Sequence, residues 1–122
     1  MTDKLRLLVV DDEDGLRTLI KSELELHGFE VDEADGGTIA LEVLKSGSYD
    51  VVLLDMLMPD MDGLEVLRII KTEKLAKKVI MLTGVGELKI AHDSLDLGAD
   101  DFLTKPVEMK NIIACINRVT ND

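Results

Sequence analysis

The sequence is poor in several residue types, and each shortage excludes a class of protein. Its 122 residues include one cysteine, so no disulfide can form within the chain. Two prolines and nine glycines, with 46% hydrophobic residues, do not fit a disordered chain. The apolar runs are far shorter than the roughly 20 residues that cross a membrane. We therefore expect a single soluble domain over residues 1–122.

Basic residues are also scarce, since 14 lysines and arginines stand against 25 acidic residues and give a net charge of −11. This charge repels a phosphate backbone, so we expect no direct nucleic-acid binding by this domain. The first residues lead straight into a strand-like segment, without the basic and apolar stretches of a signal peptide. We therefore expect a cytoplasmic protein that does not bind membranes. Cys115 falls in an apolar helical pattern and is interpreted as a small buried residue, not as a nucleophile or metal ligand.

What the sequence does contain is a regular alternation of strand-like and helix-like segments. Apolar runs predict five strands, at residues 6–10, 29–34, 51–55, 78–82 and 102–103. Apolar residues at helical spacing follow each strand, including a last pattern over residues 109–119. Alternation with short connections is typical of an α/β protein, and five units are too few for an eight-unit barrel. The prediction is a doubly wound parallel sheet with helices on both faces.

The strand at residues 51–55 is the predicted centre of this sheet. Four apolar residues precede Asp55, as expected for a parallel strand that is covered on both faces. Pro59 disfavours a helix at the residue before it, so a loop follows the strand. Asp55 therefore stands at the carboxyl end of a strand, where open α/β sheets place their functional groups. A carboxylate that only caps the loop is the alternative, and position alone does not separate the two.

Polar residues also stand at the carboxyl ends of the other predicted strands. Asp11 and Asp12 follow the first strand, Thr83 the fourth and Lys105 the fifth. Each has a simple structural alternative, because acids cap loops, threonine is common in strands and lysine is usually solvated. One shared site explains all of them together, whereas the alternatives require a separate coincidence for each residue.

Carboxylates gathered at one edge of a sheet need a compensating positive charge, because a pair roughly 4 Å apart repels by about 4 kcal/mol at an effective dielectric near 20. Oxygen ligands on short acidic loops suit a hard divalent cation, and few protein ligands with several waters suit Mg²⁺ better than Ca²⁺. Lys105 supplies a second, fixed positive charge. A carboxylate beside Mg²⁺, an ammonium and a hydroxyl is equipped to attack phosphorus and to hold the phosphoryl oxygens.

A second acidic segment, Asp60-Met61-Asp62-Gly63, looks like the start of a calcium-binding loop. The other acidic positions of such a loop, and its distant glutamate, are absent. Asp62 is therefore interpreted as the cap of the helix that follows.

Four motifs occur in order along the chain: Val9-Val-Asp-Asp-Glu13, Leu53-Leu-Asp-Met-Leu-Met-Pro-Asp-Met-Asp-Gly63, Met81-Leu-Thr-Gly84 and Gly98-Ala-Asp-Asp-Phe-Leu-Thr-Lys-Pro106. Together they make essentially the whole sequence resemble the response-regulator receiver domain. The resemblance implies a flavodoxin-like, five-stranded sheet in the order 2-1-3-4-5. It also implies that Asp55 accepts a phosphoryl group from a histidine kinase or a histidine phosphotransfer protein.

The same resemblance implies which residues bind the metal. Asp12, Asp55 and the backbone carbonyl of Leu57 are expected to bind Mg²⁺, with Asp11 acting through water. The resemblance also places Leu57 and Val85, two residues beyond Asp55 and Thr83, beside the path of a water that attacks the phosphoryl group. Neither side chain can orient that water, so slow self-hydrolysis is expected.

Further roles follow from the resemblance at the end of the chain. Thr83 and Lys105 are expected to bind phosphoryl oxygens, the Lys105–Pro106 peptide to be cis, and Phe102 to be the switch aromatic. The domain is then a signalling module that catalyses only its own phosphorylation and dephosphorylation. Its last two helices and fifth strand are expected to act on an output domain or protein. Whether it stands alone, and whether it forms a phosphorylation-dependent homodimer, stay open.

Three other classes of protein share part of this pattern. Phosphatases of the haloacid dehalogenase type also use a strand-end aspartate with Mg²⁺, but they need a second aspartate where this chain has Leu57. An FMN carrier of flavodoxin type needs a glycine- and hydroxyl-rich phosphate loop where this chain has Asp11, Asp12 and Glu13. A receiver without chemistry would not need all the site residues. Mg²⁺-dependent labelling by acetyl phosphate or a beryllofluoride mimic separates these interpretations.

Overall fold

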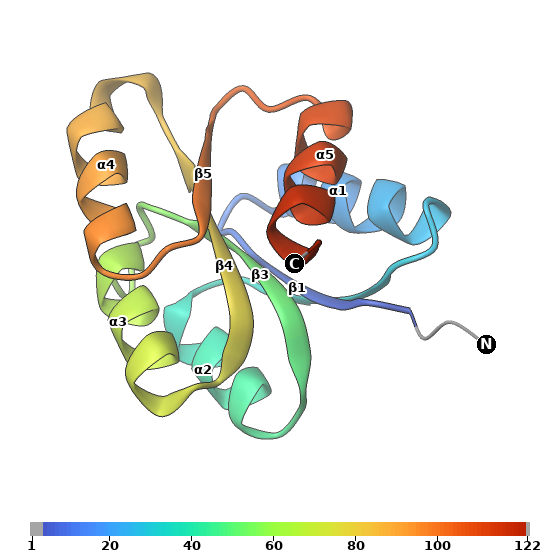
Figure 1. Cartoon of the computed structure of the whole chain (residues 1–122), viewed down its shortest axis with the longest axis horizontal. Helices are drawn as coiled ribbons and strands as arrows, with labels where there is room; N and C mark the ends of the chain where they lie inside the picture. Colours follow the sequence, from blue (N-terminus) through green and yellow to red (C-terminus); the bar gives the residue numbers. More distant parts are fainter. Residues whose placement is uncertain (1–3, 122) are drawn as a thin grey trace.

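A computed structural model describes residues 4–121, apart from the side chain of Val85, and there five strands alternate with five α-helices (Figure 1). The strands are β1 (Arg6–Val10), β2 (Glu30–Ala34), β3 (Tyr49–Asp55), β4 (Ala76–Thr83) and β5 (Asp101–Thr104). The helices are α1 (Asp14–Leu26), α2 (Gly37–Lys45), α3 (Gly63–Glu73), α4 (Leu88–Asp96) and α5 (Met109–Thr120), and a 3-10 turn, η1 (Val85–Glu87), precedes α4. The predicted alternation is confirmed, and no strand end differs from its prediction by more than two residues.

The five strands form one parallel sheet in the order β2-β1-β3-β4-β5, as the resemblance implied. Leu54 of the central strand β3 lies between Val10 of β1 and Met81 of β4. Residues 51–54 are fully buried because both faces of the sheet are covered. The connection that follows β1 runs to β2 on one side, and the connection that follows β3 runs to β4 on the other side. The two connections therefore diverge at the carboxyl ends of β1 and β3. Such a switch point is where open α/β sheets place their functional site.

Helices α2, α3 and α4 cover one face of the sheet, and α1 and α5 cover the other (Figure 1). Alternate strand residues supply the two cores: Leu8 and Val10 face the first layer, and Leu7 and Val9 face the second. Cys115 of α5 is fully buried in the second core, which confirms its interpretation as a small core residue. No helix within residues 4–121 has the length and apolar character needed to span a membrane.

Candidate functional site

The candidate site lies at the carboxyl edge of the sheet. Asp55 and Thr83 are the last residues of β3 and β4, while Asp11 directly follows β1 and Lys105 directly follows β5. Asp11 and Thr83 are fully buried, and only 6% of Asp55 is exposed. Because the strands are parallel, residues that are far apart in the sequence meet at this edge.

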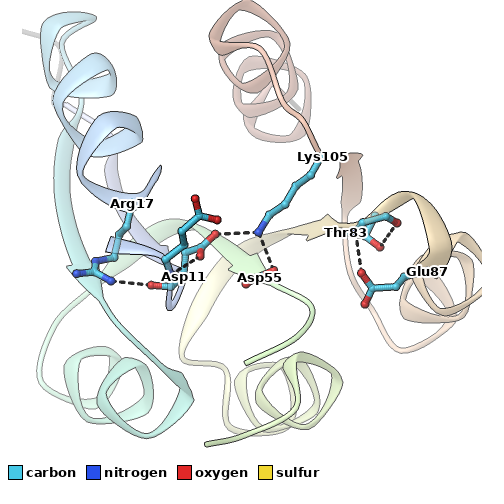
Figure 2. Close-up of polar contacts among 8 residues, drawn as sticks. Asp11, Arg17, Asp55, Thr83, Glu87 and Lys105 are labelled. Carbon is cyan, nitrogen blue, oxygen red and sulfur yellow. Dashed lines mark hydrogen bonds and ion pairs between the residues drawn. The ribbon is translucent and has the colours of Figure 1, made fainter. Parts of the chain in front are cut away.

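Lys105 connects the two buried aspartates across the sheet. Its Nζ lies 3.1 Å from Oδ2 of Asp11 and 3.1 Å from Oδ1 of Asp55 (Figure 2). The other oxygen of Asp11 accepts the backbone N–H of Glu13 at 2.8 Å. Both oxygens of Asp11 are thus hydrogen-bonded, and the ammonium of Lys105 fixes the orientation of Asp55.

Asp11, Asp12 and Asp55 each bring one carboxylate oxygen into a group whose members lie within 4.8 Å of one another. Asp12 is exposed, so the group opens to solvent on its side. One ammonium cannot neutralise three carboxylates, and hard oxygen donors are the ligands that Mg²⁺ prefers. The chemistry of these donors therefore fits a divalent cation at this edge of the sheet.

The pKa values of the buried groups show the effect of this charge imbalance. Burial, together with the charge of Asp11, raises the pKa of Asp55 from 3.8 to about 6, although Lys105 lowers it in part. For Lys105, burial lowers the pKa, but the charges of Asp55 and Asp11 outweigh burial and the net pKa is raised. Lys105 therefore stays charged, and without a cation Asp55 holds its proton more tightly than an ordinary aspartate does.

Thr83 lies beside the turn that follows β4. Its hydroxyl donates to the carbonyl of Gly84 at 3.3 Å, and the N–H of Gly84 donates to Oε1 of Glu87 at 2.9 Å. Figure 2 shows Thr83 and Glu87 on the side of Lys105 that faces away from Asp11. Thr83 is therefore close to the predicted phosphoryl site, but its hydroxyl is engaged by the turn.

The structure also places the other residues that the resemblance singled out. Phe102 is half-buried on β5, and its ring meets that of His92 edge to face, with centroids 5.3 Å apart. Leu57 is 59% exposed. The Lys105–Pro106 peptide is cis, as the resemblance implied. The side chain of Val85, the second residue linked to phosphoryl lifetime, lies outside the described part of the chain.

Arg17 supports the loop between β1 and α1 and was not singled out by the sequence. Its Nη1 donates to the carbonyl of Asp11 at 2.8 Å (Figure 2), and its Nε donates to Glu33 on β2 at 2.7 Å. Only 12% of the side chain is exposed. Arg17 therefore ties the backbone of Asp11 to the neighbouring strand, a contact that no sequence pattern indicated.

Asp60 is the second residue that the sequence did not assign to the site. Its two carboxylate oxygens accept the N–H groups of Gly37 and Thr38 at 3.1 and 3.0 Å. Asp62, by contrast, accepts the N–H of Leu64 at 2.9 Å and caps α3, which confirms its predicted role.

Comparison with known proteins agrees with this geometry. The response regulator receiver domain family matches residues 7–117. The chemotaxis protein CheY of Bacillus subtilis is 38% identical over 117 residues, which cover 95% of this chain and 98% of CheY. The transcriptional regulatory protein ResD of the same organism is 38% identical over 112 residues, which cover 92% of this chain but 46% of ResD. The chain thus spans about half the length of several of its curated relatives.

Solved structures give the same result. A response regulator receiver domain from Clostridium thermocellum has a TM-score of 0.91 and 38% identity, with 96% of this chain and 94% of that chain covered. A CheY-like receiver domain from Methanospirillum hungatei has a TM-score of 0.92 and 30% identity, with 98% and 95% covered. The acidic strand ends, the strand order and these relatives agree, and the chain therefore belongs to the response regulator receiver domains, the phosphoacceptor domains of two-component systems.

Proposed function

We propose that this domain takes a phosphoryl group onto Asp55 from a histidine kinase or histidine phosphotransfer protein, with Mg²⁺, and passes the signal to an output domain or protein. The observation that carries the proposal is the position of Asp55. It ends the central strand, is nearly buried, accepts a hydrogen bond from the ammonium of Lys105, and forms a group of acids with Asp11 and Asp12. Catalysis is limited to the domain's own phosphorylation and dephosphorylation.

The chemistry follows from the groups around Asp55. A carboxylate oxygen attacks phosphorus as the P–N bond of the donor's phosphohistidine breaks, and the electron pair of that bond returns to the imidazole. Lys105, already 3.1 Å from Oδ1 of Asp55, can neutralise phosphoryl oxygens without moving far. Thr83 can donate its hydroxyl to a phosphoryl oxygen once it leaves the carbonyl of Gly84.

The acids at this edge fit the metal-binding roles that the resemblance implied. Asp12, Asp55 and the carbonyl of Leu57 would hold Mg²⁺ directly. Asp11 already uses both oxygens, for Lys105 and for the N–H of Glu13, which supports its acting through water. When bound, Mg²⁺ supplies the positive charge that keeps Asp55 ionised and attracts the phosphoryl group.

Labelling with acetyl phosphate, read by intact mass, tests this proposal. Wild-type protein should gain a phosphoryl group in Mg²⁺ and lose that ability in EDTA, because unshielded acids repel the donor. Asp55→Asn should abolish labelling, Asp12→Ala should strongly reduce it, and Asp11→Ala should be milder. Asp32→Asn, an acid outside the site, is the matched control and should label normally. Labelling that survived EDTA or Asp55→Asn would contradict the proposal.

The proposed output is a conformational switch of α4, β5 and α5. Phosphorylation adds about two negative charges, which should draw the hydroxyl of Thr83 from Gly84 toward the phosphoryl group. The bond that Thr83 gives up is long, at 3.3 Å, and so is easily replaced. Movement of Thr83 leaves space for Phe102 to turn inward from its contact with His92.

Amide NMR spectra with and without beryllofluoride test the switch. We expect shifts across residues 84–110 in the wild type and smaller ones in Thr83→Ala, which should still accept phosphate. Phosphorylation should shift the equilibrium between the inactive and the active-like conformation by a few kcal/mol at most. A minor active-like population is therefore expected without phosphate. An unchanged spectrum in residues 84–110 of the wild type would refute the switch while leaving phosphorylation intact.

A further inference from the structure

Helix α2 begins without a capping side chain of its own. Gly36 stands at its N-cap in an extended conformation, and its first turn carries no acidic residue. The first N–H groups of a helix have no partner within the helix and need one from elsewhere. Asp60, more than 20 residues further along the chain, supplies it: Oδ1 accepts from Gly37 and Oδ2 accepts from Thr38. Asp60 therefore caps α2 from a different loop.

That loop, residues 56–62, directly follows Asp55 and carries Leu57. Both of its ends are fixed, because the N–H of Met56 donates to Leu82 at 2.9 Å and that of Gly63 donates to Met56 at 3.0 Å. Asp60 ties the later part of the loop to α2. The conformation of the segment after Asp55 thus depends on a helix that has no residue in the site.

Gly36 makes this tie possible by its lack of a side chain. A Cβ atom there would lie 2.7 and 2.9 Å from the two carboxylate oxygens of Asp60, and all three of its nearest atoms belong to Asp60. The N–H of Thr38, with that of Gly37, lowers the pKa of Asp60, so the cap stays ionised at neutral pH. The contact between Gly36 and Asp60 is therefore close and specific.

We propose that Asp60 is a positioning residue, which holds the segment after Asp55 so that the carbonyl of Leu57 and the carboxylate of Asp55 can bind Mg²⁺ together. This inference rests on the proposed function. The alternative is that Asp60 only stabilises α2. The two differ in one respect: a positioning residue changes the affinity for Mg²⁺ even when the helix is capped in another way.

A titration with Mg²⁺ alone, followed by the amide NMR shifts of residues 10–13 and 55–58, measures this affinity. We expect Asp60→Ala to weaken Mg²⁺ binding by about threefold to tenfold, since residues that orient metal ligands have effects of this order or larger. Asp60→Asn removes the same charge but keeps one acceptor oxygen, so its affinity for Mg²⁺ should fall between those of the wild type and Asp60→Ala. Asp62→Ala is the matched control, because it removes a charge and a helix cap from the same loop without breaking the tie to α2.

The double variant Asp60→Ala/Gly36→Asn separates positioning from helix stability. Removing the Asp60 carboxylate removes the three nearest atoms that a Cβ at position 36 would meet, and asparagine is a favoured N-cap in extended conformations. We expect thermal stability to return toward that of the wild type while Mg²⁺ affinity stays low. Recovery of affinity along with stability would overturn the inference, as would an Asp60→Ala affinity equal to that of the wild type or no weaker than that of Asp62→Ala. If the wild type itself shows no Mg²⁺-dependent shifts near Asp55, the proposed function fails and takes this inference with it.

Discussion

Charged residues are arranged differently at the two edges of the parallel sheet. Toward the amino edge, Arg6 lies 3.1 Å from Asp32 and stacks over the ring of Tyr49 at 4.7 Å from its centroid. The hydroxyl of Tyr49 also donates to Asp32 at 2.5 Å, and the N–H of Arg6 donates to Asp50 at 2.8 Å. At this edge, Asp32 and Asp50 are therefore each paired with a positive group or a hydrogen-bond donor.

At the carboxyl edge, three aspartates lie close together but only two of them pair with a lysine, Lys105, and burial adds to this charge mismatch. Asp55 responds with a pKa raised to about 6. A carboxylate that is costly to ionise in the folded protein lowers stability at neutral pH, whereas a partly exposed ion pair such as Arg6 with Asp32 adds a small amount. The comparison indicates that the amino edge contributes to stability, while the carboxyl edge gives up stability to keep a reactive, cation-binding group.

The largest expected change in the free energy of unfolding is that of Asp55→Asn in EDTA. At neutral pH the substitution removes a buried charge and should stabilise the protein by about 2 kcal/mol. The pKa shift of about two units, which already includes the favourable effect of Lys105, corresponds to about 3 kcal/mol and sets the upper limit of this gain. Denaturant titration of both proteins gives the difference in unfolding free energy.

The pH dependence of that difference has a definite sign. The pKa of Asp55 is higher in the folded protein than in the unfolded chain, so stability falls as pH rises from about 4 to about 6. Asp55→Asn lacks this loss, so its advantage should be absent well below pH 4 and complete at neutral pH. A variant that is less stable than the wild type at pH 7, or a stability difference that does not change with pH, would contradict a stability cost at the carboxyl edge.

A smaller effect of opposite sign is expected for Tyr49→Phe at the amino edge. This change removes a hydrogen bond from a buried hydroxyl to Asp32 and should destabilise the protein by about 1 kcal/mol. The Mg²⁺ affinity, measured by NMR titration, should match that of the wild type because Tyr49 lies at the far end of β3. A stabilising effect would contradict the contribution of the amino edge to stability. A loss of Mg²⁺ binding would show that the two edges are not independent.

The sequence predicts the fold well where apolar runs are uninterrupted. The central strand and its terminal Asp55 follow from the residues at 51–54, which are fully buried. The start of β4 is harder to predict, because it begins at Ala76 and includes Lys77 and Lys78, which interrupt the apolar pattern. The strand accommodates the charge of Lys77 because the ammonium reaches solvent and lies 3.4 Å from Asp50.

The candidate site is predictable only in part, because some of its contacts join elements that are far apart in the sequence. Asp11, Asp55 and Lys105 could be identified because each ends or directly follows a strand, and parallel topology brings such residues together. Arg17 and Asp60 could not, because their partners lie on other elements, 16 residues away for Glu33 and 23 for Gly37. Contacts of this kind depend on how a helix packs against a strand or a loop packs against a helix, which no local pattern encodes.

The last effect is kinetic and is expected at Leu57, whose side chain is apolar and exposed beside the charged edge. It cannot accept or donate a hydrogen bond, so it cannot orient a water for attack on phosphorylated Asp55. Leu57→Asn should therefore speed the loss of phosphate by about threefold to tenfold, below the factor of roughly 100 that a positioned general base supplies. Leu19→Asn, on α1 and 55% exposed, is the matched control. The phosphorylated fraction, followed by intact mass after the phosphodonor is removed, gives the rate. If Leu57→Asn and the wild type lose phosphate equally fast, the lifetime is set elsewhere and the apolar side chain only fills space.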